Sequence, residues 1–127
     1  MALERINPED LPRPETYTQV VIAKGTRLVF VSGQEPEDVH GRLVGRGDLS
    51  MQARQVFANL VAVLKAAGTS MDQVVKATVF LRHMADFTAM NEIYAEHLGK
   101  ATPARSTVAV TELPRGALVE IDLIAVL

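Results

Sequence analysis

Cysteine is absent from the 127-residue chain. A disulfide framework, a thiolate nucleophile and a zinc site with cysteine ligands are therefore all excluded. Aromatic residues make up only 5% of the sequence and tryptophan is missing, which disfavours a stacking platform for single-stranded nucleic acid. Neither sign of charge dominates, since 13 Lys and Arg face 15 Asp and Glu for a formal net charge of −2. This balance predicts no strong non-specific attraction to nucleic acid or to anionic lipid.

Long hydrophobic runs are also missing. No apolar stretch approaches the roughly 20 residues that a membrane span requires. The first five residues, 1–5, lack the apolar core of a secretory signal, so we expect a cytoplasmic protein.

His40, His83 and His97 show no paired spacing typical of metal ligands, and we expect each on the surface. The sequence thus predicts neither a metal nor a cofactor.

The composition is that of an ordinary globular protein, with 48% hydrophobic and 22% charged residues. We expect a single domain over 1–127. The prolines of 7–14 predict an irregular segment before the first strand, which we expect over 17–23. A turn at 24–26 then predicts a hairpin into a second strand at 28–31.

The clearest predicted helix covers 49–67, where apolar residues recur at spacings of three and four. Asp48 is placed to cap its start, and Gly68 suits a left-handed residue at its end. The segment 35–47 before it reads as a loop with a short ribbon around Leu43. The remaining elements are expected to be a strand at 74–81, a helix at about 84–98, and closing strands at about 105–111 and 118–126.

The order β-β-α-β-α-β-β predicts an α+β fold, one mixed sheet with two helices. Right-handed crossovers would place both helices on one face. The closing strand is nevertheless apolar on both faces: Val119, Ile121, Leu123 and Ala125 on one, Leu118, Ile124 and Val126 on the other. A strand with apolar residues on both faces is usually buried on both sides. Other copies of the chain are the simplest cover for the face that the helices leave open. We therefore expect a homo-oligomer.

Three polar residues stand where chemistry is possible. Arg105 opens a strand without acidic neighbours, so its planar guanidinium is suited to a carboxylate; the alternative is a solvated strand end or a structural ion pair. Glu120 interrupts an apolar strand and could hold a water or act as an acid or base, or else face solvent, as we expect of Asp122. Asn91 lies on the apolar stripe of the second helix and needs a backbone or ligand partner. Tyr17 and Ser32 could line a pocket or simply close strand ends.

Several motifs resemble the RidA/YjgF family, formerly the L-PSP endoribonuclease family. The resemblance runs from Tyr17 to Val126. It rests on these segments: Val31-Ser32-Gly33-Gln34, Val75-Lys76-Ala77-Thr78-Val79-Phe80-Leu81, Asp86-Phe87…Asn91…Tyr94, Pro103-Ala104-Arg105-Ser106, Leu113-Pro114 and Val119-Glu120-Ile121.

The resemblance implies a chorismate-mutase-like fold assembled into a trimer, with sites in the clefts between subunits. Enzymatic members hydrolyse reactive enamines and imines, such as 2-iminopropanoate and 2-iminobutanoate, to 2-oxo acids and ammonia. The residue matched by Arg105 binds the substrate carboxylate, and the residue matched by Glu120 positions the attacking water. Further ligand-contacting positions fall on Tyr17, Ser32, Gly33, Asn91 and the backbone at Thr107.

Two features depart from the archetypal deaminases. Those proteins have Gly-Pro before the tyrosine, where this chain has Glu15 and Thr16, and they often have cysteine in place of Thr107. The first change lies at the implied pocket entrance, so it bears on which substrate is accepted. A non-catalytic module that binds a small carboxylate and signals through a partner is the main alternative. RNA cleavage, suggested by the older family name, fits poorly with the net charge and the scarce aromatics.

Overall fold

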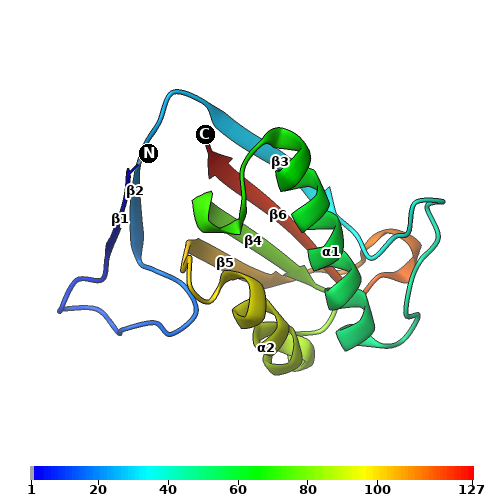
Figure 1. Cartoon of the computed structure of the whole chain (residues 1–127). Helices are drawn as coiled ribbons and strands as arrows, with labels where there is room; N and C mark the ends of the chain where they lie inside the picture. Colours follow the sequence, from blue (N-terminus) through cyan, green and yellow to red (C-terminus); the bar gives the residue numbers. More distant parts are fainter. Residues whose placement is uncertain (1) are drawn as a thin grey trace.

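The computed structural model describes residues 2–127, so Met1 of the N-terminal segment considered above lies outside the described residues. The strands are β1 Ala2–Ile6, β2 Val20–Lys24, β3 Leu28–Gln34, β4 Val74–Leu81, β5 Ala104–Ala109 and β6 Val119–Val126. The helices are α1 Leu49–Ala67 and α2 Phe87–Leu98, with short 3₁₀ helices at Met71–Gln73, Met84–Asp86 and Pro114–Gly116. Figure 1 shows their arrangement.

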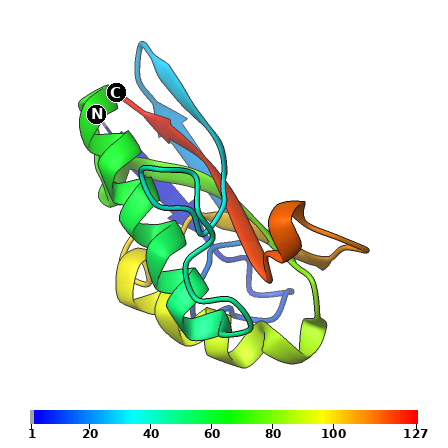
Figure 2. The same ribbon diagram turned by 90° about the vertical axis from the view of Figure 1, so that its right-hand side faces the viewer.

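The main sheet has the strand order β3-β6-β4-β5. β4 and β5 run parallel, whereas β6 is antiparallel to both β3 and β4. Both helices pack against the same face of this sheet (Figure 2). The predicted α+β class, with a mixed sheet and two helices on one face, is confirmed.

The core lies between the helices and the sheet. β6 alternates strictly along most of its length, so Val119, Ile121 and Leu123 are buried while the residues between them are half exposed. α1 contributes a fully buried stripe that includes Phe57 and Leu60. This alternation matters for function because it fixes which face of the sheet each polar residue of β5 and β6 occupies.

The predicted ends of α1 are confirmed. The Asp48 carboxylate accepts a hydrogen bond from the Met51 backbone N–H at 3.1 Å, which satisfies one orphan donor of the first turn. Gly68 adopts a left-handed φ of 84°, and its N–H returns to carbonyls of the last turn. The expected short ribbon in the preceding loop is also present, as a bridge between Glu37 and Leu43.

The predicted hairpin between the strands at 17–23 and 28–31 is wrong. β2 instead pairs antiparallel with β1, from Ala2 opposite Lys24 to Ile6 opposite Val20, in a sheet of its own. Local pattern reveals strands but not their partners, and β1 had not been recognised as a competitor for β2. We call residues 2–24 the N-terminal ribbon; Figure 1 shows its two strands beside the main sheet rather than in it.

The face of the sheet opposite the helices, called here the open face, carries apolar side chains without cover in the described chain. Leu28 is 59% exposed and Phe30 is 71% exposed on β3, and Val108 on β5 is also exposed. Exposed apolar area of this kind is typical of an interaction surface.

Among the described residues, no helix is both long and apolar enough to cross a membrane.

Candidate active site

The register of β5 places Arg105 on the helix-covered face of the sheet. Arg105 is paired with Ala77 of β4, which is fully buried beneath the helices. Its guanidinium carbon lies 5.2 Å from the ring centroid of Tyr17, 5.5 Å from that of Phe87 and 4.6 Å from that of Tyr94. Three aromatic rings therefore surround a half-buried cation at distances where cation–π attraction acts.

The guanidinium is held by an amide rather than by an acid. Arg105 Nη1 donates to Asn91 Oδ1 at 2.6 Å, and the Thr16 hydroxyl donates to the same oxygen at 3.2 Å. Within residues 2–127, Arg105 makes no ion pair with a carboxylate. Burial lowers the pKa of Arg105, while Tyr94 and Tyr17 oppose that shift, and an arginine stays charged regardless. The result is a cation suited to an anion from outside.

Two buried hydroxyls share this side of the sheet. Thr107 is paired with the buried Val79 and so faces the same way as Arg105. The Thr107 Oγ1 and Tyr94 Oη atoms are both buried without a hydrogen-bond partner in the described part of the chain. Burial also raises the pKa of the Tyr94 hydroxyl, which keeps it a donor. We call Tyr17, Asn91, Tyr94, Arg105 and Thr107 the arginine half of the site.

Glu120 lies on the open face. It is opposite Phe80 of β4 and falls between the buried residues Val119 and Ile121. A Cβ atom added to Gly33 would collide with the Glu120 carboxylate and lie 2.9 Å from its Cδ atom. Glycine at this position thus leaves the carboxylate room to lie against the β3 backbone.

Ser32 and Gly33 form a β-bulge in β3, and the bulge places Gly33 against the Glu120 side chain. Val31 is opposite Leu123 and Gln34 is opposite Ile121, so β3 fits one more residue than β6 into this stretch. Such bulges redirect side chains and often occur near functional sites. Ser32 is exposed beside this bulge. We call Ser32, Gly33 and Glu120 the glutamate half of the site.

Further carboxylates lie close to the glutamate half, those of Asp122, Glu35 and Glu37. Burial raises the pKa of Glu120, and the neighbouring Asp122 raises it further. The pKa of Glu35 is raised by burial and then by Glu37 and Glu120, whereas Arg115 opposes the shift. A carboxylate with a raised pKa holds a proton more tightly and is the stronger base.

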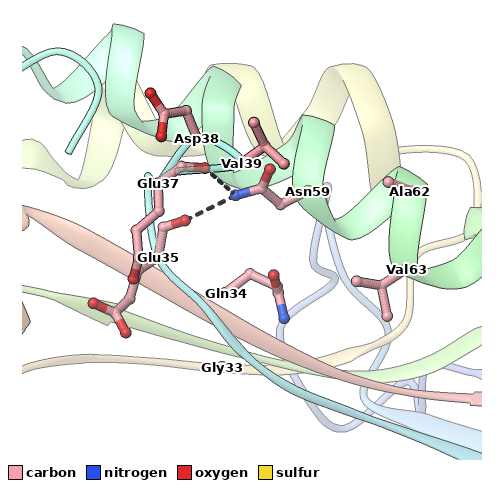
Figure 3. Close-up of a pocket in the computed structure, with 9 residues that line it drawn as sticks. All are labelled: Gly33, Gln34, Glu35, Glu37, Asp38, Val39, Asn59, Ala62 and Val63. Atoms are coloured by element: carbon pink, nitrogen blue, oxygen red, sulfur yellow. Dashed lines mark hydrogen bonds between the residues drawn. The ribbon is translucent and has the colours of Figure 1, made fainter. Parts of the chain in front are cut away.

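The segment that follows the bulge is braced from two sides. The Asn59 amide of α1 donates to the Glu35 carbonyl at 3.0 Å and to the Glu37 carbonyl at 2.9 Å (Figure 3). Arg115 bonds the carboxylates of the same two residues at 3.1 and 2.7 Å. A cavity of about 420 Å³ lies between α1 and this segment, and Arg105 is not among its lining residues. Asn59 and Arg115 therefore hold Glu35 and Glu37 in place, directly after the bulge that contains Gly33.

The seven residues predicted from the sequence fall into two groups. Tyr17, Asn91, Arg105 and Thr107 gather on the helix-covered side, and Ser32, Gly33 and Glu120 gather on the open face. The sheet separates the groups, so one chain cannot place both on one small molecule. Sequence reasoning missed Phe87 and Tyr94 as neighbours of Arg105, because aromatic residues at a spacing of seven on a helix read as core.

The three histidines differ in their placement. His97 was expected at the surface, but it is half buried and its ring stacks on Phe57 with centroids 4.4 Å apart and planes at 10°. His40 and His83 are exposed, as expected. In the described part of the chain, no group of three or more His, Asp and Glu side chains could hold a metal ion.

Comparisons with known proteins agree with the sequence motifs. The model of the endoribonuclease L-PSP family matches residues 10–127. A RutC family protein of Pyrococcus horikoshii is 43% identical over 96% of this chain and 96% of its own length. The 2-iminobutanoate/2-iminopropanoate deaminase of Dermatophagoides farinae is 40% identical over 87% of this chain and 85% of its own length. The solved structure of the Rid family protein YyfB from Yersinia pestis, 30% identical, superposes over 100% of both chains with a TM-score of 0.90.

Proposed function

Because the chain belongs to the RidA/YjgF family, that of the endoribonuclease L-PSP model, we propose that it hydrolyses the C=N bond of small 2-imino acids. The products are 2-oxo acids and ammonia. The observation that carries this proposal is the half-buried Arg105, which makes no ion pair with a carboxylate of residues 2–127. The deaminase of Dermatophagoides farinae supports the choice of reaction.

In this proposal the arginine half binds the substrate carboxylate. Asn91 engages Nη1 of Arg105, and the three rings keep the guanidinium plane in place. Its remaining N–H groups are suited to a carboxylate, which matches the planar fork of arginine. The unpartnered hydroxyls of Tyr94 and Thr107 supply further donors. An aromatic and aliphatic surround strengthens each of these bonds by excluding water.

The glutamate half handles the water. A 2-imino acid is already electrophilic at its imine carbon, so the protein needs only to orient the substrate and deliver water. The Glu120 carboxylate accepts a proton from the water as the water oxygen bonds to that carbon, and it then gives this proton to the imine nitrogen. In the resulting carbinolamine the same carboxylate accepts the hydroxyl proton and passes it to the amino nitrogen, so the C–N bond breaks, ammonia leaves and a C=O group remains. The negative charge around Glu120 also repels the substrate carboxylate, which directs it toward Arg105.

The two halves meet only if they come from different copies of the chain. We propose a homotrimer in which Arg105 of one subunit faces Glu120 of the next. The exposed apolar residues of the open face, Leu28, Phe30 and Val108, support such an assembly because they need cover. Opposite charges on the two halves favour this pairing of unlike faces.

A direct assay tests the proposal. The chain is added to 2-iminopropanoate generated by an amino acid oxidase, and the disappearance of imine is followed by a trapping reagent. We expect faster loss of imine than in buffer and than with the Arg105→Ala variant. A chain that binds 2-oxobutanoate but does not accelerate the loss is a non-catalytic carboxylate-binding module.

A further inference from the structure

β1, β2, β3 and β5 each have one edge that is unpaired among the described residues, and β2 and β3 are joined by a short connection. β2 has β1 on one side, and β3 has β6 on one side; the other edge of each strand pairs with no strand of residues 2–127. Both strands also expose apolar side chains: Val20 is 45% exposed and Ile22 46% exposed, beside Leu28 and Phe30 on β3. An open edge with apolar side chains is a template for pairing with another chain.

The N-terminal ribbon is nevertheless firmly placed, away from its own β3. The Thr18 N–H donates to the Pro103 carbonyl at 3.1 Å, and the Thr18 hydroxyl donates to the Thr102 carbonyl. Arg5 donates to the carbonyl of Ala101 in the same segment. Together with Tyr17 on Arg105, these contacts hold the ribbon over the arginine half of its own chain.

We propose that the ribbon is exchanged between copies: β2 of one chain pairs antiparallel with the free edge of β3 in a neighbouring chain. The inference rests on the proposed function and deepens it, because the exchanged pair joins the two halves of the site. The ribbon sits on the cationic half of its own chain, and the neighbour's β3 leads into the glutamate half. Adding β2 to that edge therefore carries Glu120 of the neighbour toward Arg105.

The register of this pair follows from the connection between the strands. Only Gly25, Thr26 and Arg27 separate β2 from β3. Strand exchange keeps the pairing that a closed hairpin would make and changes only the chain that supplies it. That pairing sets Ile22 opposite Phe30 and Val20 opposite Ser32, so the exposed apolar residues of both strands share one face. Tyr17 then lies between the two halves of the site.

Engineered cysteines test the exchange cleanly because the chain has none of its own. Directly opposite residues of paired strands lie within the range that a disulfide spans. The Ile22→Cys/Phe30→Cys double variant is assembled, oxidised and run on a non-reducing gel. We expect covalent dimers and trimers, and a disulfide between chains when the two single variants are refolded together. Each single variant alone is expected to remain uncrosslinked.

The control is Glu4→Cys/Ile22→Cys, whose positions are opposite each other within the ribbon, so it closes inside one chain. If the control closes while Ile22→Cys/Phe30→Cys links only within one chain or not at all, the exchange is overturned. Should that double variant not assemble, Val20→Cys/Ser32→Cys probes the same register with the same two outcomes. Sedimentation of the reduced proteins separates the strand exchange from the intersubunit site. If the reduced protein has a mass near three chains and the oxidised protein links only within one chain, the exchange alone is overturned. If the reduced protein has the mass of a single chain, the intersubunit site is overturned as well.

Discussion

The Arg105 guanidinium and the Glu120 carboxylate lie on opposite faces of one sheet. Arg105 is in register with the buried Ala77, and Glu120 is in register with the half-exposed Phe80 three residues further along the same strand. Side chains alternate along a strand, so this odd separation sends them to different sides. A reaction that needs both groups therefore needs two copies of the chain.

Removing Arg105 should cost catalysis far more than folding. Arg105→Ala would leave a substrate carboxylate unpaired in a partly dry site, a loss on the order of 2–5 kcal/mol. That corresponds to roughly thirty-fold to several-thousand-fold in catalytic efficiency. Arg105→Lys should recover only part, because a point charge lacks the planar fork. Titration with 2-oxobutanoate, imine hydrolysis and thermal unfolding check this; unchanged activity with a lowered melting temperature would make Arg105 structural.

Gly33→Ala should lower turnover without destabilising the protein. The added methyl group meets the end of the flexible Glu120 side chain, so the carboxylate moves rather than the backbone. If the effect acts through Glu120, the same change in a Glu120→Gln background should cause no further loss of turnover. Steady-state rates and unfolding curves of the three variants test this coupling. Independent losses would show that Gly33 acts by another route.

Asn91→Asp should lower the affinity of the site for a carboxylate ligand. The amide oxygen accepts from Arg105 at 2.6 Å, so a carboxylate there would form a charge-assisted bond and compete with the substrate. We expect affinity for 2-oxobutanoate, measured by calorimetry, to fall further for Asn91→Asp than for Asn91→Ala. Equal affinities in the two variants would argue against carboxylate binding at Arg105.

The pH profile of turnover should carry the signature of Glu120. Only the ionised carboxylate accepts a proton, and burial with Asp122 nearby raises its pKa. The acid limb should therefore lie above the ordinary range of a glutamate. Asp122→Asn removes one cause of the raised pKa, so the limb should shift to lower pH. If the acid limb of the profile stays at the same pH in the Asp122→Asn variant, the group that titrates there is not Glu120.

Sequence patterns predicted the elements whose causes are local. α1 was bounded by its apolar period, by Asp48 and by Gly68, and the structure confirms each of these. The N-terminal ribbon was missed because β2 could pair with either of two strands. Only long-range contacts, such as those of Thr18 with the segment before β5, decide between them.

The candidate residues were visible in the sequence, but their separation was not. Glu120 was recognised as an interruption of an apolar strand, and Arg105 as a cation without an acidic neighbour. Their relative faces depend on how β4 pairs with both β5 and β6, which no local pattern encodes. The aromatic surround of Arg105 was hidden for a similar reason, since Phe87 and Tyr94 also suit a helix core.

Complementation between two impaired variants tests the central claim most directly. Arg105→Ala and Glu120→Gln chains are purified separately, mixed in equal amounts, dissociated and reassembled. If each site takes Arg105 from one subunit and Glu120 from the next, random trimers should regain about a quarter of the wild-type sites. Imine hydrolysis should then recover to about that fraction, while each variant reassembled alone keeps only its own low residual rate. No recovery in mixtures shown by mass to contain both chains would place the two residues in one subunit's site and contradict the account.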